Sequence, residues 1–212
     1  MFKAIKEWFV SAKEKERVDN YWIFASMLVG SVLSLIASFV LSVEAVTLAS
    51  NPDAVLACSI NAVLNCATVG LHPTASLFGF PNAFLGLIAE PVVMTVAIAG
   101  LMGVRFPRKF LFVAQIFYTL GFIFAYWLLY TSMFTIGALC PWCLLVTVTT
   151  TFVFFSMTRY NIREENLYLP KTWSKKAKNF VAKDFDKLVL FLLVVFVIFA
   201  ILIKYREGIF GV

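Results

Sequence analysis

The sequence predicts an all-α membrane protein, a four-helix transmembrane bundle with a fifth transmembrane helix beside it. Of the 212 residues, 61% are hydrophobic and only 14% are charged, whereas soluble domains carry about 25% charged residues. The apolar residues also gather into charge-free stretches, at residues 20–43, 54–89 and 110–158. Because a bilayer core of about 30 Å needs roughly 20 apolar residues per helix, the last stretch is long enough for two spans and a turn.

Five spans are predicted, four that overlap these stretches and a fifth in a further apolar run at residues 188–203. The apolar part of the first is longer than the roughly 7–15 residues of a signal-peptide core and lies about 20 residues from the start, so we expect it to stay as an anchor. The fifth is the shortest of the set. The predicted spans are Trp22–Val46, Pro81–Val104, Phe110–Thr131, Ala138–Met157 and Leu188–Ile203.

The segments outside the spans are short, and two of them are rich in lysine. The first 20 residues and the second half of the connection before the last span both mix aromatic side chains with lysines, which is typical of helices that lie on a membrane surface. The predicted order is an amphipathic N-terminus (1–20), the four-helix bundle (21–160) with an outer loop at 47–80, a basic linker (161–187), the fifth span (188–204) and an outer tail (205–212).

The distribution of basic residues predicts the orientation in the membrane. All but Lys204 and Arg206 of the 18 lysines and arginines fall before the first span, between the second and third, or between the fourth and fifth. Cytoplasmic loops collect these residues, so we expect a multi-pass cell-membrane protein whose N-terminus is cytoplasmic and whose loop 47–80 is extracytoplasmic. Basic flanks that face anionic lipid also account for the net charge of +6 without any nucleic acid.

This topology places all four cysteines on the extracytoplasmic side, where disulfides persist. Cys58 and Cys66 lie in the loop, and Cys140 and Cys143 form a Cys-Pro-Trp-Cys motif where the fourth span begins. The unpaired N–H groups at a helix start favour a thiolate, and a low thiol pKa speeds disulfide exchange. One sulfur would face water and the other lipid, as an enzyme that joins thiol chemistry to a lipid-soluble oxidant requires.

Other uses of four cysteines stay open from the residues alone. Two structural disulfides in a non-catalytic transporter or assembly subunit are one alternative, although a Cys-x-x-Cys bridge closes too small a loop to stabilise much. A four-cysteine zinc site normally has two closely spaced pairs, and the step from Cys58 to Cys66 is loose for that, so we expect no metal. Haem attachment would want a histidine after Cys143, where Leu144 stands.

The order of these motifs resembles the vitamin K epoxide reductase family. The residues that carry the resemblance are the loop cysteines within Cys58–Asn61 and Leu64–Cys66, the stretch Phe78–Asn82, and Cys140–Cys143. They are most similar to bacterial, actinobacterial-type members, without the thioredoxin-fold domain that many relatives carry fused. In the unrelated four-helix quinone reductases of disulfide formation the two cysteine pairs come in the reverse order.

The resemblance implies a membrane thiol-disulfide oxidoreductase that reoxidises a secreted disulfide oxidase and supports disulfide bond formation in exported proteins. Cys58 would receive electrons from a separate extracytoplasmic thioredoxin-fold (DsbA-like) protein, and Cys66 would pass them to Cys140. Cys143 would then reduce a membrane quinone, with menaquinone favoured over ubiquinone. The sequence by itself does not set the direction of electron flow.

Further polar residues are candidates for the quinone site. The resemblance implies that Asn82 hydrogen-bonds a quinone carbonyl, although an N-cap role is an equal expectation. Thr147 stands where some relatives have a tyrosine that contacts the ring, and Trp142 is an interfacial aromatic that can reach the quinone. Glu90, deep in the second span, and His72, in the loop, are candidates for proton transfer. The remaining loop-side acids, Glu44 and Asp53, are expected only to solvate the loop.

Overall fold

A computed structural model describes the backbone of residues 2–206 and the side chains of residues 17–206. Helices account for most of this part of the chain, which contains no strand beyond one isolated bridge. The elements are α1 (Phe2–Ser50), α2 (Cys66–Gly70), the 3₁₀ turn η1 (Pro73–Ser76), α3 (Ala83–Leu101), α4 (Arg108–Thr131), the π-turn η2 (Ser132–Ile136), α5 (Pro141–Arg163), α6 (Lys171–Ala182) and α7 (Phe185–Lys204).

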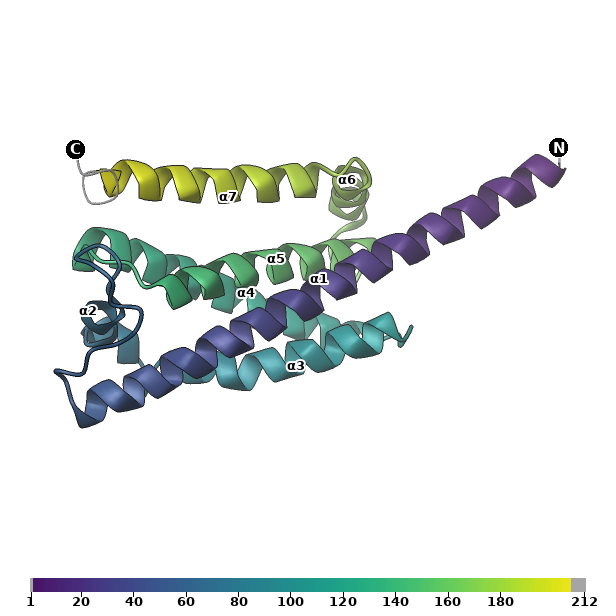
Figure 1. Ribbon diagram of the computed structural model, residues 1–212. Coiled ribbons are helices and arrows are strands. Elements are labelled where there is room, and N and C mark those ends of the chain that lie inside the picture. The colour runs from purple at the N-terminus through teal and green to yellow at the C-terminus, as the bar shows by residue number, and fades with distance from the viewer. Residues whose placement is uncertain (1, 207–212) are drawn as a thin grey trace.

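Five of these helices, within the described residues, are long and apolar enough to cross a membrane, namely α1, α3, α4, α5 and α7. The chain is therefore an all-α membrane protein, as the sequence predicts. In Figure 1 the five helices run side by side, and α6 lies across one end of them. We call this end, which also holds the α3–α4 turn, the basic end. The opposite end, where α2, the loop 51–82 and the start of α5 lie, is the cysteine end (Figure 1).

Small side chains let α1 and α3 approach closely at the centre of the bundle. Ser31, Ser34 and Ser38 of α1 are all buried, and a Cβ atom added at Gly86 of α3 would lie 2.8 Å from that of Ser38. Helices in a membrane gain no hydrophobic energy by associating, so close backbone packing supplies much of their attraction. The serine face of α1 thus fixes the wall of the bundle against which α3 rests.

An ion-pair cluster joins three helices at the basic end. The guanidinium of Arg159, on α5, lies 3.2 Å from Asp19 of α1 and 2.8 Å from Asp186 of α7. It also lies 2.9 Å from Asp184, and Arg163 pairs with Asp19. The α7 helix has no fully buried residue, and it is attached by this cluster and, at the cysteine end, by Tyr205 together with the partly buried Val197, Ala200 and Ile201.

The helices differ from the predicted spans mainly at their ends. The first predicted span, Trp22–Val46, lies within α1, which is one helix of 49 residues that continues into the N-terminal segment. Whether that segment is amphipathic concerns side chains of residues 1–16, which lie outside the described residues, as does the tail 207–212. The loop begins after Ser50 rather than at residue 47, since nothing in the sequence 47–50 breaks a helix.

Candidate functional site

The loop that carries Cys58 and Cys66 is docked by its backbone onto the residues just before α5. Leu64 and Leu139 form an isolated parallel bridge, in which the N–H of Asn65 donates to the Leu139 carbonyl at 2.9 Å. The N–H of Leu139 donates in turn to the carbonyl of Val63 at 2.7 Å. Asn65, which follows Leu64, directly precedes Cys66, and Leu139 directly precedes Cys140. The bridge therefore brings Cys66 against Cys140.

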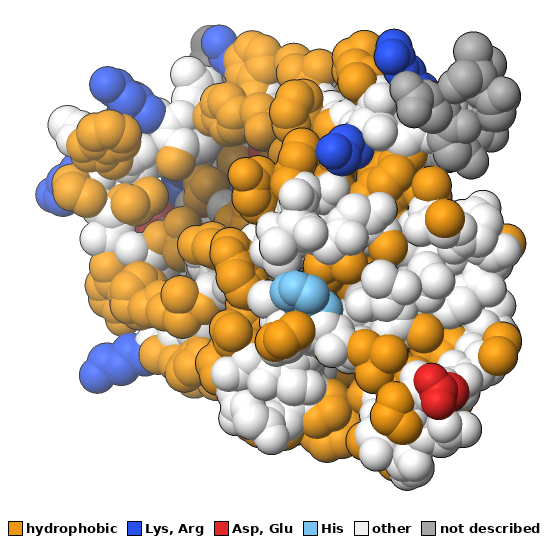
Figure 2. Space-filling model, turned by 90° about the vertical axis from the view of Figure 1, so that its left-hand side faces the viewer, with side chains coloured by type: hydrophobic (Ala, Val, Ile, Leu, Met, Phe, Trp, Pro, Cys, Tyr) orange, Lys and Arg blue, Asp and Glu red, His pale blue; other side chains and the backbone are white. Residues whose placement is uncertain are grey.

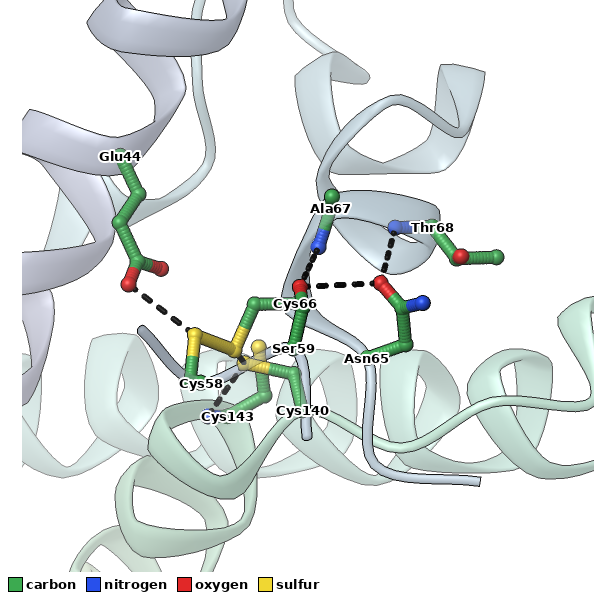
Figure 3. Close-up of a disulfide and its surroundings, with 9 residues drawn as sticks. All are labelled: Glu44, Cys58, Ser59, Asn65, Cys66, Ala67, Thr68, Cys140 and Cys143. Atoms are coloured by element: carbon green, nitrogen blue, oxygen red, sulfur yellow. Dashed lines mark hydrogen bonds between the residues drawn. A yellow bond between two sulfur atoms is a disulfide. The ribbon is translucent and has the colours of Figure 1, made fainter. Parts of the chain in front are cut away.

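Three sulfurs meet at this point. Cys58 and Cys66 form a disulfide, and the Sγ of Cys140 lies 3.4 Å from the Sγ of Cys66 (Figure 3). This distance is short enough for thiol–disulfide exchange to begin without rearrangement of the helices. Both loop cysteines are buried, although they lie in a loop. Cys58 is only 7% exposed and Cys66 only 3%, because Leu48, Leu56 and Trp142 pack around them.

Cys140 and Cys143 are free thiols at the start of α5. Cys140 is the N-cap residue and Pro141 occupies the first turn, where a missing N–H has no helical partner to lose. The Cys140 sulfur accepts a hydrogen bond from the Cys143 N–H at 3.4 Å. Hydrogen bonding from the Cys143 side chain and backbone lowers the pKa of the Cys140 thiol, although burial opposes the shift. Of the two α5 thiols, Cys140 is thus the one that exchanges with Cys66 as a thiolate, whether it attacks Cys66 or leaves from it.

This lowered pKa predicts a titration that can be followed by the ultraviolet absorbance of thiolates. With the Cys58–Cys66 disulfide intact and Cys140 and Cys143 reduced, we expect a thiolate that persists below the ordinary thiol pKa of about 8.5. Because the folded-state pKa is depressed, the thiolate stabilises the fold at higher pH, and this contribution disappears as the pH falls through the lowered value. A Cys140→Ser variant should lack the low-pH step, and a step that survives in it would contradict the assignment.

Glu44 is a part of the site that the sequence did not reveal. Its Oε1 lies 3.0 Å from the Sγ of Cys58, and its Oε2 is buried without a hydrogen-bond partner (Figure 3). The expectation that Glu44 only solvates the loop is therefore wrong, since α1 continues past it and turns it toward the sulfurs. Glu44, Cys58 and Cys66 are also spaced like metal ligands, but disulfide-bonded sulfurs offer no thiolate to a metal.

A cavity of about 600 Å³ opens beside Cys143, within the size range of small-molecule sites. Its walls come from α1, α3, α4, α5 and the loop, and they are mostly apolar, with Phe117, Phe124 and Val146 among them. Cys143 is half-buried and contributes to the wall, as do Cys140 and Cys66. A flat apolar ring in this cavity would therefore lie against the α5 cysteine pair.

Besides Glu44 Oε2, two further buried polar atoms in the same cavity wall have no hydrogen-bond partner. Glu90 accepts a hydrogen bond from Ser34 through Oε1 at 2.9 Å, but its Oε2 has no partner. The hydroxyl of Tyr118, on α4, is the other such atom. Buried polar groups are normally satisfied, so an unpaired carboxyl oxygen and an unpaired hydroxyl in a cavity indicate a polar ligand group. Tyr118 was not predicted, because the sequence does not show toward which neighbours a single aromatic side chain in an apolar span points.

Asn82 and Thr147 both line the cavity, as expected of ligand-binding residues. Asn82 stands at the N-cap position of α3 but makes no side-chain capping bond, so the capping expectation is wrong. Its Nδ2 donates to the carbonyl of Thr74 at 2.7 Å and its Oδ1 accepts from the N–H of Leu77, which ties the loop to α3. Thr147 donates to the carbonyl of Cys143 at 2.9 Å, so its hydroxyl hydrogen is already in use.

His72 and Trp142 are not among the described residues that line the cavity. The Nδ1 of His72 accepts from the N–H of Thr74 and lies 2.8 Å from its hydroxyl, so the ring caps η1. Trp142 packs against the cluster that surrounds the loop disulfide. The structure thus places His72 in a turn and Trp142 around the sulfurs, while Asn82, Thr147, Glu90 and Cys143 share the cavity.

Comparisons with known proteins were consistent with this site. The model of the vitamin K epoxide reductase family matches residues 25–158, which include all four cysteines and four of the five long helices. No curated protein sequence matched the chain.

Proposed function

Because the chain belongs to the vitamin K epoxide reductase family and is a membrane thiol-disulfide oxidoreductase, we propose that it carries electrons from a secreted thioredoxin-fold oxidase to a membrane quinone. The observation that supports this most directly is the sulfur arrangement. A buried loop disulfide lies 3.4 Å from a free Cys-x-x-Cys pair, and that pair borders an apolar cavity. By this route the protein supports disulfide formation in exported proteins.

The proposed relay consists of four exchanges of sulfur partners. A thiolate of the oxidase attacks Cys58, and Cys66 leaves as a thiolate. Cys66 then attacks the oxidised Cys140–Cys143 pair at Cys140, which releases Cys143. The second thiolate of the oxidase takes back its own sulfur and releases Cys58, and Cys58 attacks Cys66, which releases Cys140. The oxidase is now a disulfide, and the relay has the pairing of the structure, with Cys58–Cys66 bonded and the α5 thiols reduced.

The α5 thiols then reduce the quinone. Cys140 and Cys143 lose two electrons and two protons and become a disulfide, while the quinone becomes a quinol. The volume and apolar walls of the cavity suit a quinone ring, and an isoprenoid tail could leave between helices toward lipid. Menaquinone is the quinone that we propose first, with ubiquinone as the other candidate. The potential of a quinone relative to thiols drives the transfer, at about 1.4 kcal/mol for each 30 mV.

Glu90 is the proposed proton donor for quinol formation, with Tyr118 beside it as a hydrogen-bond donor. We expect Glu90→Gln to lower the rate of quinol formation by roughly 100-fold, since general acid catalysis contributes about 10²–10⁴-fold. The measurement is single-turnover reduction of menadione by the pre-reduced protein. The matched control is Thr95→Val, which changes an exposed polar residue of the same helix outside the cavity. A rate in Glu90→Gln within about threefold of the wild type would remove Glu90 from the mechanism.

The proposed partner docks at the cysteine end, which faces the extracytoplasmic space in the proposed orientation. Figure 2 shows this end covered mostly by hydrophobic and uncharged side chains, with few charges across its middle. Val55 and Ile60, which flank Cys58 in the loop, are 93% and 68% exposed. Since Cys58 itself is buried, the partner has to displace the loop segment 51–57 before its thiolate can reach the sulfur.

A trapping experiment tests the proposed function. In cells that carry Cys66→Ser, Cys58 is a free thiol that can attack the Cys-x-x-Cys disulfide of the oxidised partner and release its second cysteine as a thiolate. Because Cys66 is absent and cannot displace the partner from Cys58, we expect a covalent complex with a secreted thioredoxin-fold protein, joined through its Cys-x-x-Cys motif. Mass spectrometry of the reduced complex identifies the attached chain. Cys58→Ser/Cys66→Ser should give no such complex. If Cys66→Ser captures no thioredoxin-fold protein although it is expressed and folded, the proposed electron source is wrong.

A further inference from the structure

The carboxyl of Glu44 contacts a sulfur of the loop disulfide. Its Oε1 is 3.0 Å from Cys58 Sγ, and Oε2 is buried without a partner (Figure 3). A disulfide-bonded sulfur carries no hydrogen, so an attractive contact at this distance requires that the hydrogen belong to the carboxyl. An ionised carboxylate here would instead place an unpaired charge in a water-poor setting, which is unfavourable.

The proposed relay needs a group that can give a proton to a buried sulfur and take it back. Each cycle carries two electrons and two protons from an external dithiol to the α5 pair, yet Cys66 and Cys140 are only 3% and 2% exposed. Thiolates that form at buried sulfurs cannot take a proton from bulk water directly. Glu44 lines the same cavity as Cys66, Cys140 and Cys143, and it contacts the loop disulfide from the Cys58 side, whereas Cys140 contacts it from the Cys66 side (Figure 3).

We propose that Glu44 is a catalytic residue that protonates Cys58 when this sulfur leaves and removes the proton again when Cys58 attacks. This role rests on the proposed relay. When the partner's second thiolate takes back its sulfur, the S–S electron pair passes to Cys58, and the Glu44 carboxyl gives its proton to form a thiol. When Cys58 attacks Cys66, its proton returns to the Glu44 carboxylate and Cys140 leaves with the electron pair. Glu44 thus starts and ends each cycle protonated.

The test uses the full-length protein in lipid nanodiscs, oxidised at both cysteine pairs, with dithiothreitol as the dithiol probe. Acid quenching, maleimide labelling and mass spectrometry report when Cys140 and Cys143 become thiols. We expect Glu44→Gln to slow this transfer by about 100-fold near neutral pH. The groups that face Glu44 and titrate with it are the sulfurs of the loop and of the start of α5. As the pH rises past about 8.5, thiolates form without an acid–base group, so the deficit should shrink.

Two further variants make the outcome decisive. Asp53→Asn removes an exposed carboxylate of the same loop and should transfer electrons at the wild-type rate. Glu44→Asp keeps a carboxyl and should keep the wild-type shape of the pH profile at a reduced rate, which gives an answer even if Glu44→Gln fails to fold. Equal slowing of Glu44→Gln at every pH, or no slowing, would overturn the role of Glu44.

The same measurements separate this inference from the relay itself. If Cys66→Ser reduces the α5 pair as fast as the wild type, electrons do not pass through the loop disulfide and the proposed relay fails. If Cys66→Ser is inactive and Glu44→Gln behaves like the wild type, the relay stands and only the role of Glu44 falls.

Discussion

Replacement of Cys143 by serine is expected to lower quinol formation by at least about 1,000-fold. A serine hydroxyl at this position can neither donate electrons nor form a disulfide with Cys140, so the α5 pair can no longer be oxidised by a quinone. Stopped-flow absorbance of menadione, with the protein-free reaction with dithiothreitol subtracted, measures the loss. The Cys143 position lines the cavity without closing the helix start, so the fold should be retained.

The same variant should accumulate a specific sulfur pairing. With Cys143 absent, Cys140 has Cys66 as its neighbour at 3.4 Å, and the mixed disulfide Cys66–Cys140 should build up under mild oxidation. Peptide mapping without reduction detects this bond, and Cys58 should then be free to react with maleimide. Cys143→Ser protein that still produced quinol at the wild-type rate would exclude the α5 pair as the quinone reductant.

Replacement of Arg159 by methionine should destabilise the bundle by about 3 kcal/mol. The guanidinium lies mostly buried among Asp19, Asp184 and Asp186. Its removal takes the cation from Asp186, while Asp19 keeps only Arg163 and Asp184 keeps only Lys187. Methionine keeps most of the volume of the side-chain stem, so the effect reports charge rather than a cavity. Unfolding by sodium dodecyl sulfate in mixed micelles, followed by circular dichroism, gives the free energy.

Two variants control for the loss of a basic side chain. Lys178→Met breaks an exposed pair with Glu165 at the same end of the molecule and should change stability little, because solvent screens such pairs. Arg159→Met combined with Asp186→Asn should recover part of the loss, since one of the uncompensated charges is gone. Equal stability of Arg159→Met and the wild type would show that packing alone attaches α7.

The sequence predicted the membrane fold well because a membrane helix is recognised by its apolar composition, which does not depend on contacts with other parts of the chain. Charge-free stretches define membrane helices by the bilayer alone, and the five spans follow from them. The ends of the helices were less accurate. The continuation of α1 to Ser50 and of the third span through η2 depends on local hydrogen bonding, which composition does not encode.

Only those residues of the candidate site that belong to a sequence motif could be predicted. The cysteines could be located by topology, whereas Glu44 and Tyr118 could not, because a single carboxyl or phenol in a helix has no direction until its neighbours are packed. The burial of Cys58 was also missed, since it results from Leu48 and Trp142, which come from two distant parts of the chain. Directions of side chains inside a bundle are set by contacts far apart in sequence.

The approach of the two redox pairs is held by main-chain hydrogen bonds of residues 63–65 and 139, and no exposed side chain of the loop takes part in them. Substitution of exposed loop residues such as Val55 and Ile60 can therefore alter the shape and polarity of the face offered to the proposed oxidase without changing the distance between Cys66 and Cys140. The choice of partner can thus change in evolution while electron transfer between the cysteine pairs is preserved. A proline at position 65 or 139 would remove one of the bridging N–H groups and so disturb the contact between the pairs.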